Sequence, residues 1–286
     1  EYRRQRQMCI RDRSRGMRIG VISDLHIDRH PKLKSNVYLE TLIKVVQHRE
    51  IDLLLIAGDI SNYFRDSYQF IKDLKTALHI PVLFVPGNHD YWKVEDGTTS
   101  QDIYDFYRTK PECLLDHPYV INDNWAIVGH TAWYDYSYAD KKFEETRLKK
   151  GKYYGATWQD KVKIDWDEDD TILSKKAAKH VKQELEQLQD KQIILMTHIV
   201  THSKFVVPTP HRIFDFFNAF IGTSDFDRLY QQFPIKYSIM GHVHFRKSLV
   251  ENNITFLCPC LGYKREWRTA DIYSEMNHAL IDFVIE

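Results

Sequence analysis

Three short apolar runs alternate with two longer segments of mixed polarity near the start of the chain. The runs at 18–23, 52–57 and 80–85 are short and aliphatic, as strands buried on both faces are. In the segment 35–50 apolar residues recur close to every 3.6 positions, which predicts a helix, and a second helix is expected at 64–79. Buried strands separated by helices predict a mostly parallel sheet with both faces covered.

The remainder of the chain is less regular. We expect a hairpin formed by 120–121 and 125–128, a helix at 170–189 and a buried strand at 192–196. A short helix is expected at 224–233. It is followed by four expected strands at 236–240, 245–250, 254–257 and 278–285. The end of the chain is therefore predicted to be β-rich and antiparallel.

No internal repeat, low-complexity tract or flexible linker divides the chain, so we predict one domain over residues 17–286. Within it, the segments 131–170 and 199–223 are expected to be cap-like insertions. Residues 1–16 stand apart, because they contain six arginines, no hydrophobic periodicity and no apolar core of a signal peptide. Since a strand is expected to begin directly at Met17, we interpret residues 1–16 as a non-native or disordered leader.

The composition narrows the class of protein. Of the 286 residues 43% are hydrophobic, which is too many for a disordered or fibrous chain. The 40 basic and 40 acidic residues give a net charge of zero, which argues against a protein that coats nucleic acid or an anionic membrane. No run approaches the roughly 18 apolar residues of a membrane-spanning helix. The four cysteines lack the paired spacing of a zinc site, so reduced thiols and a cytoplasmic location are expected.

Each expected buried strand is followed by side chains that can bind a metal ion. In chain order these are Asp24 and His26, Asp59, Asn88, His198, and His242 with His244. Ligands in open α/β sheets gather at the carboxyl ends of the strands, so these residues should converge on one edge. Carboxylates, an amide oxygen and imidazoles suit Mn, Fe or Zn better than Ca or Mg. Seven ligands exceed the need of one ion, whereas two ions that share a carboxylate fit the count and catalyse in-line phosphoryl transfer.

Glycines accompany three of these motifs. Gly58, Gly87 and Gly241 stand where a strand must turn sharply and bring its backbone close to the ions. Any one of the histidines, taken alone, is more often a structural residue than a ligand. Five motifs in this order, each at the end of an expected strand, favour the metal site.

The order of the motifs is Asp-x-His, Gly-Asp, Gly-Asn-His-Asp, a lone His and Gly-His-x-His. It resembles that of the calcineurin-like metallophosphoesterases over residues 17–286. The resemblance implies an α/β fold, a four-layer αββα sandwich, with a dinuclear centre of two divalent transition-metal ions, Mn favoured over Fe and Zn. It also implies a role for each residue: Asp24, His26 and His244 at the first metal, Asn88, His198 and His242 at the second, Asp59 bridging both, and His89 as the catalytic acid.

The chemistry of the residues agrees with these roles. A water that bridges two metal ions has its pKa lowered towards neutrality and can attack phosphorus in line. His89 cannot easily share a metal with its neighbour Asn88, so it is free to contact the scissile phosphate and protonate the leaving oxygen. Two interpretations of Asp90 stay open, since it either orients His89 or caps the following turn.

Two further features bear on the substrate. The segment 131–170 contains nine aromatic residues, which either roof the metals and stack on a substrate or pack the insertion onto the sandwich. His130, His202 and His211 either reach the substrate phosphate and the metal ligands or are ordinary structural residues. Neither feature identifies the substrate.

The favoured function is a metal-dependent phosphoesterase, similar to a bacterial group of phosphoesterases. It would hydrolyse phosphomonoester or phosphodiester bonds of a small or medium substrate, with nucleic acid only as a substrate. A DNA nuclease of the same fold is the first alternative, but the zero net charge and the lack of a basic stripe count against it. A non-catalytic scaffold is the second, and the intact ligand set with His89 counts against it.

Overall fold

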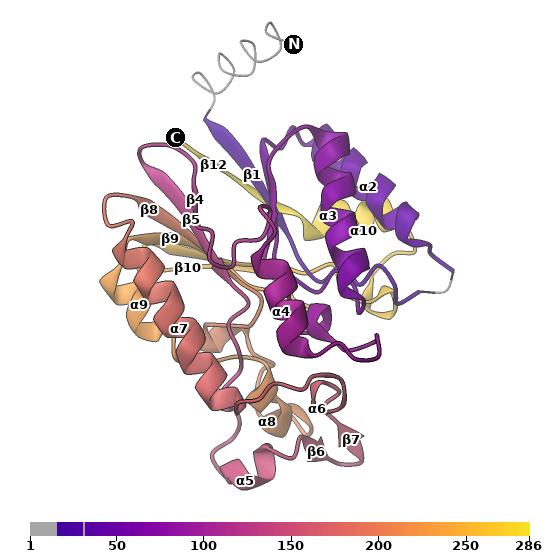
Figure 1. Cartoon of the computed structure of the whole chain (residues 1–286), viewed down its shortest axis with the longest axis vertical. Coiled ribbons are helices and arrows are strands. Elements are labelled where there is room, and N and C mark those ends of the chain that lie inside the picture. Colours follow the sequence, from indigo (N-terminus) through magenta and orange to yellow (C-terminus); the bar gives the residue numbers. More distant parts are fainter. Residues whose placement is uncertain (1–15, 31) are drawn as a thin grey trace, which may run out of the picture.

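Two β-sheets form the centre of the molecule (Figure 1). The computed structural model describes residues 16–30 and 32–286, so the expected leader, apart from Gly16, lies outside the described residues. The smaller sheet has the order β12-β1-β2-β3. Its strands are β12 (Ile281–Ile285), β1 (Met17–Ile22), β2 (Leu53–Ile56) and β3 (Val82–Phe84). As predicted, β1, β2 and β3 run parallel, while β12 pairs antiparallel with β1 at the edge.

The larger sheet has the order β10-β11-β9-β8-β5-β4. Its strands are β4 (Tyr119–Val120), β5 (Trp125–His130), β8 (Gln192–Thr197), β9 (Ile235–Ile239), β10 (Arg246–Glu251) and β11 (Ile254–Pro259). β5, β8, β9 and β11 are parallel, and β4 and β10 are antiparallel to their neighbours. The expected hairpin of β4 and β5 is confirmed.

The predicted antiparallel end of the chain is only partly correct. β10 and β11 form a hairpin through Asn252 and Asn253, both of which have positive φ, as tight two-residue turns require. In the sheet β11 lies between β10 and β9, and it pairs parallel with β9. The strand expected at 278–285 is also shorter. Helix α10 (Ile272–Ala279) occupies its start, and the Asp271 side chain caps this helix by accepting from the Ser274 N–H.

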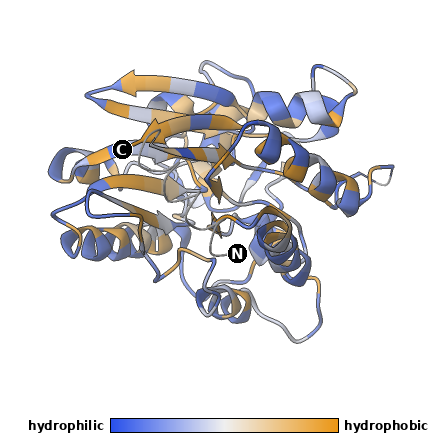
Figure 2. Ribbon diagram, turned by 90° about the horizontal axis from the view of Figure 1, so that it is seen from above, coloured by the Kyte–Doolittle hydropathy of each residue, from blue (hydrophilic) through white to orange (hydrophobic). Residues whose placement is uncertain are grey.

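The two sheets share an apolar core. Side chains in a strand alternate between its two faces, so each sheet offers one set to the other. The facing sets are almost fully buried and include Ile19, Val21, Leu53, Leu55, Ile127, Ile194, Met196, Ile239 and Leu257. The opposite sets, among them Leu54, Ile56, Ala126, Val128 and Leu195, are equally buried and pack in a second core with the helices. In Figure 2 hydrophobic colour therefore concentrates on the strands.

Helices cover both outer faces. Helices α2 (Ser35–His48), α3 (Phe64–Leu78) and α10 lie on the smaller sheet, and α7 (Asp170–Glu186) and α9 (Asp227–Gln232) lie on the larger one (Figure 1). The four-layer αββα arrangement is thus confirmed. Helix α4 (Ser100–Arg108) was not expected, although Thr99 and Asp102 form a capping box at its start. No helix in the described part of the chain is long and apolar enough to cross a membrane.

The two expected insertions pack against each other at one end of the molecule (Figure 1). The first contains α5 (Glu145–Leu148), β6 (Lys152–Tyr153), β7 (Ala156–Thr157) and α6 (Asp160–Lys163). The second contains α8 (Phe214–Phe217) between two short 3-10 helices, Ser203–Phe205 and Asn218–Phe220. Their contact is aromatic, since the ring of Tyr153 stacks on Phe216 and that of Trp158 on Phe220. Many of the aromatic residues therefore serve packing.

Candidate metal centre

All seven predicted ligands lie in loops that follow β1, β2, β3, β8 and β9. Backbone hydrogen bonds join these loops: Asp24 N–H donates to Gly58 O (3.0 Å), and Gly241 N–H donates to His198 O (2.9 Å). The first bond connects the loops after β1 and β2 of the smaller sheet, and the second connects the loops after β8 and β9 of the larger sheet. His242 N–H also donates to Asp24 Oδ2 (2.9 Å), which joins the loops of the two sheets. The structure therefore brings the predicted residues to one edge.

The ligand loops contain an unusual backbone conformation. φ is positive at Asp24 (56°), His26 (45°), Asp59 (57°), His242 (73°) and His244 (62°). Such a conformation costs a non-glycine residue about 1–3 kcal/mol, and it persists where the surroundings enforce it, often at functional sites. Five of the seven candidate ligands share this conformation. The shape of these loops therefore indicates a functional site.

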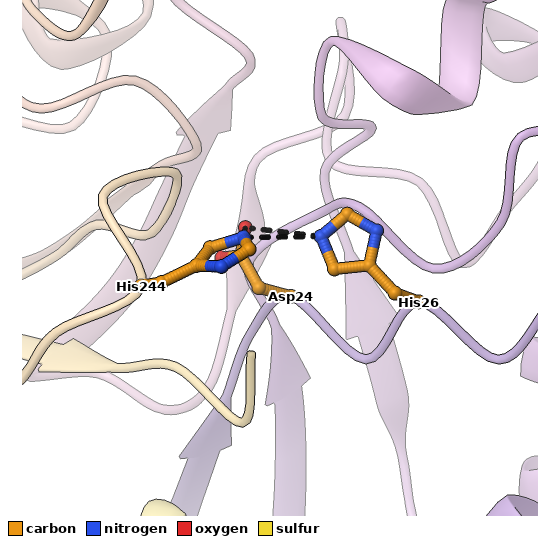
Figure 3. Close-up of side chains that lie close together, drawn as sticks. All are labelled: Asp24, His26 and His244. Atoms are coloured by element: carbon orange, nitrogen blue, oxygen red, sulfur yellow. Dashed lines mark hydrogen bonds and ion pairs between the residues drawn. The ribbon is translucent and has the colours of Figure 1, made fainter. Parts of the chain in front are cut away.

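The first group contains Asp24, His26 and His244 (Figure 3). His244 Nε2 lies 3.2 Å from Asp24 Oδ1 and 3.2 Å from His26 Nε2, and His26 Nε2 lies 3.7 Å from Asp24 Oδ1. The other oxygen, Asp24 Oδ2, accepts hydrogen bonds from Ser23 Oγ (2.6 Å) and from Cys260 Sγ (3.3 Å). Asp24 Oδ1 is buried and has no hydrogen-bond donor among the described residues.

A carboxylate holds His244 in place. His244 Nδ1 lies 2.8 Å from Glu266 Oε1, and because a carboxylate only accepts, Nδ1 carries the hydrogen. The lone pair of neutral His244 is then at Nε2, facing the bare Asp24 Oδ1. Two acceptors in contact repel each other unless a proton or a metal ion lies between them, so a metal ion can occupy this position in place of a proton. A carboxylate behind a histidine is also the usual support of a histidine ligand.

The second group contains Asp59, His198 and His242, with Asn88 beside them. His198 Nε2 lies 3.3 Å from Asp59 Oδ2 and 3.0 Å from Asn88 Oδ1. His198 Nδ1 donates to Ala57 O (2.6 Å), so its lone pair also faces two acceptor oxygens. The result is a second cluster of acceptors that a cation would satisfy.

In this group backbone carbonyls set the orientation of the histidine rings. His242 Nε2 donates to Phe220 O (2.7 Å), which leaves Nδ1 as its ligand atom. Phe220 belongs to the second insertion, so this insertion supports the site directly. The rings of His198 and His242 lie 5.1 Å apart.

The electrostatics favour positive charge at both groups. Burial lowers the pKa of His198, but Asp59 and Asp24 outweigh it and raise the pKa to about 10. Burial likewise lowers the pKa of His244, but Asp24 and Glu266 outweigh it and again raise the pKa to about 10. A divalent cation bound at these groups would supply this positive charge in place of the protons.

Two of the glycines are required for close approach. A Cβ on Gly87 would lie 2.2 Å from Asp59 Oδ1, and one on Gly241 would lie 2.1 Å from Ser23 Oγ and 2.5 Å from Asp24 Oδ2. Real Cβ atoms do not approach other atoms so closely. The expected close approach of the backbone is therefore seen at Gly87 and Gly241, towards the carboxylates of Asp59 and Asp24.

Comparison with known proteins identifies the family. The model of the calcineurin-like phosphoesterases matches residues 17–246. The chain belongs to this family. As a calcineurin-like phosphoesterase it is a hydrolase that acts on ester bonds, and its family is metal-dependent.

Two relatives and two solved structures give the context of this phosphoesterase. It is 25% identical to the [acyl-carrier-protein] phosphodiesterase PptH of Mycobacterium tuberculosis, over 81% of this chain and 75% of that one. The crystal structure of PptH superposes with a TM-score of 0.76 at 20% identity and covers 95% of this chain and 97% of its own. A probable cyclic nucleotide phosphodiesterase of Vesicomyosocius okutanii is 31% identical over 29% of this chain and 37% of its own. A dimetal phosphatase from Danio rerio superposes with a TM-score of 0.52 at 12% identity, over 86% and 87%.

His89 of the phosphoesterase lies at the edge of the metal groups and is half-buried. Its Nδ1 lies 2.7 Å from Asn62 Oδ1, and its ring stacks on Trp92 with a centroid distance of 4.1 Å. Its ring also meets that of His26 edge-on at 5.0 Å. Burial lowers the pKa of His89 to about 3, against an opposing effect of Asp59.

Asp90 does not touch the His89 side chain. Its carboxylate accepts from the backbone N–H groups of Asp59 (2.7 Å), Ile60 (3.0 Å) and Gly87 (2.7 Å), and from Ser67 Oγ (2.7 Å). The idea that it orients His89 is therefore wrong. Instead it fastens the loop after β2 to the loop after β3.

The other histidines considered from the sequence lie away from the ligand groups. His202 Nε2 pairs with Glu251 (2.9 Å), and His211 Nδ1 accepts from the N–H groups of its own turn. His130 Nδ1 accepts from Ala132 N–H, and its ring lies 5.5 Å from that of His180. None of these partners is a candidate ligand, which favours the structural interpretation for all three.

Sequence reasoning missed four side chains that support the site. Asn62 and Trp92 hold His89, Glu266 holds His244, and Asp160 of the first insertion contacts Asn88. Asn62 and Trp92 each lie three residues from a candidate residue, so their proximity was visible, but their roles were not. Asp160 and Glu266 reach the site only through the folding of distant segments.

Proposed function

We propose that this phosphoesterase works through a dinuclear centre in which Asp59 bridges two ions. One observation carries the proposal: Asp59 Oδ2 lies 3.6 Å from His26 Nε2 of the first group and 3.3 Å from His198 Nε2 of the second. Asp24, His26 and His244 would hold one ion, and Asn88, His198 and His242 the other. The mixed oxygen and nitrogen ligands favour Mn, with Fe and Zn as alternatives.

Two such ions would lower the pKa of a bound water and neutralise charge on the phosphoryl oxygens. The protein itself would supply the proton. We assign to His89 the contact with the scissile phosphate and the protonation of the leaving oxygen. Because burial lowers the pKa of His89, its ring would take up a proton from solvent as the substrate binds, when a phosphate oxygen next to the ring favours the charged imidazolium, and would pass this proton to the leaving oxygen.

We further propose that the substrate contains a phosphodiester bond and is of small or medium size. Support comes from the names of the relatives, which are phosphodiesterases of an acyl carrier protein and of cyclic nucleotides. A phosphopantetheine-bearing carrier protein therefore belongs in the first substrate panel, beside cyclic nucleotides. The three free, buried cysteines among the described residues, Cys113, Cys258 and Cys260, support the proposal of a cytoplasmic location.

Metal analysis and a paired ester assay test this function. Purified protein loaded with Mn²⁺ should contain about two ions per chain, and Asp59→Asn should lower both occupancies. The loaded enzyme should cleave bis(4-nitrophenyl) phosphate faster than 4-nitrophenyl phosphate. Full activity with one ion per chain would refute the dinuclear centre, and a preference for the monoester would refute the phosphodiesterase assignment.

A further inference from the structure

One carboxylate of the aromatic insertion reaches the metal groups. Asp160 begins helix α6, and only 4% of its surface is exposed. Its oxygens accept hydrogen bonds from four neutral side chains: Asn88 Nδ2 (3.1 and 2.9 Å), Trp92 Nε1 (2.8 Å), Tyr134 Oη (2.9 Å) and Trp158 Nε1 (3.1 Å). A buried carboxylate needs such donors, and each of these is a side chain whose direction it can control.

The contact with Asn88 decides which atom faces the metal position. A side-chain amide has a donor end and an acceptor end, whereas a carboxylate accepts only. The Nδ2 group must therefore face Asp160, and Oδ1 is forced to the opposite side, where it lies 3.0 Å from His198 Nε2. Rotation of the amide by half a turn would place N–H donors where a cation is to bind.

The other three donors support neighbouring groups of the same site. The ring of Trp92 stacks on His89 at 4.1 Å. The rings of Tyr134 and Trp158 lie 6.4 Å and 5.8 Å from that of His242. Asp160 thus contacts a candidate ligand directly and fixes the rings that pack on two more candidate site residues.

We infer that Asp160 is a positioning residue for the second metal ion, which it favours by holding the Asn88 amide with its oxygen towards the site. This inference rests on the proposed dinuclear centre. Asp160 itself does not bind the metal or the substrate. The aromatic insertion consequently has a role in metal binding, through one hydrogen-bonded carboxylate.

The same insertion region offers a matched control. Asp170 is also a buried carboxylate among aromatic residues, and it accepts from Trp133 Nε1 (2.7 Å), Tyr136 Oη and Lys161 Nζ (2.7 Å). None of these three donors is a candidate ligand. Asp170→Asn therefore removes a carboxylate of similar burial without freeing Asn88.

The test is calorimetric titration of the full chain with Mn²⁺. In wild type two binding events are expected. In Asp160→Asn one of the two events should lose about 10- to 100-fold in affinity, as is usual when the support of a ligand is removed. The other event should change little, and Asp170→Asn should leave both unchanged. Unchanged affinity for both ions in Asp160→Asn would overturn the inference, and so would an equal loss in Asp170→Asn.

A double variant separates orientation from packing. An aspartate at position 88 presents an oxygen whichever way it rotates, so it needs no partner to set its direction. Asp160→Asn combined with Asn88→Asp should therefore recover the second ion to near wild-type affinity. It also keeps the wild-type charge, which makes it informative if Asp160→Asn alone folds poorly. A folded double variant that still lacks the second ion would overturn the inference.

The outcomes also separate this inference from the proposed function. Wild type that binds a single ion would overturn both. Wild type that binds two ions, together with an Asp160→Asn variant that binds them equally well, would overturn the positioning role alone.

Discussion

The imidazole of His89 is held from two directions, by the Asn62 amide oxygen 2.7 Å from Nδ1 and by the Trp92 ring stacked at 4.1 Å. Since the amide oxygen accepts the Nδ1 hydrogen, Nε2 is the atom left to contact a substrate. The ring is also not part of either metal group. His89 can therefore be removed without removing a ligand.

The first prediction follows from this separation. His89→Ala should leave the metal content near that of wild type and lower turnover about 10²- to 10⁴-fold on esters with poor leaving groups. The loss should be smaller on nitrophenyl esters, whose leaving oxygen needs little protonation. Steady-state kinetics on the two ester types check it. Equal losses on both would show that His89 is not the acid.

The second prediction concerns the support of His89. Asn62→Ala removes the acceptor for Nδ1, so it should lower kcat in the same substrate-dependent way as His89→Ala, but by less, because Trp92 still holds the ring. Asn62→Asp keeps an acceptor in place and should restore most of the activity. If Asn62→Ala and Asn62→Asp behave alike, the hydrogen bond does not orient the ring.

The third prediction uses two glycines as a matched pair. Gly87→Ala would place a Cβ 2.2 Å from Asp59 Oδ1, so it should displace the bridging carboxylate and weaken the binding of both ions. Gly155 has φ of +74° and open space around it, so Gly155→Ala introduces backbone strain, about 1–2 kcal/mol, without crowding. Metal titration and thermal melts of both variants check this. Normal metal binding by Gly87→Ala would contradict it.

The fourth prediction divides the aromatic insertion by location. Trp133 is 3% exposed and bonded to Asp170, so Trp133→Ala should destabilise the fold by about 3–5 kcal/mol and leave the ratio of activities on two substrates unchanged. Trp158 lies against His242 and bonds to Asp160, so Trp158→Ala should alter the substrate ratio or the metal affinity. Thermal melts and kinetics on a nucleotide diester and a nitrophenyl ester measure the difference. If Trp158→Ala only melts early, the Trp158 ring has no role at the site.

The candidate ligands were predictable because each lies in the loop that follows a strand. A buried strand can be recognised from a short run of apolar residues. Parallel strands end at the same edge, so the sequence alone is enough to expect Asp24, Asp59 and Asn88 close together. The resemblance of the motif order to a known family added the proposed assignment of each residue to one ion or the other.

The supporting residues were not predictable in this way. Asp160 is 72 positions from Asn88, and Glu266 is 22 from His244, so nothing in the local pattern connects them. For Asp90 the error was the reverse. Its position next to His89 suggested a contact between the two side chains, but its carboxylate accepts hydrogen bonds from backbone N–H groups. The parallel pairing of β11 with β9 was missed because it depends on where the hairpin lies in the sheet.

The central claim is that two ions share Asp59. The most direct measurement is the anomalous diffraction of a crystal of the full chain grown with Mn²⁺. The account predicts two anomalous peaks about 3.5–4 Å apart, the usual separation in two-metal sites. One should contact Asp24, His26 and His244, the other Asn88, His198 and His242, and both should contact Asp59. A single peak in active protein, or two peaks that do not both contact Asp59, would contradict the account.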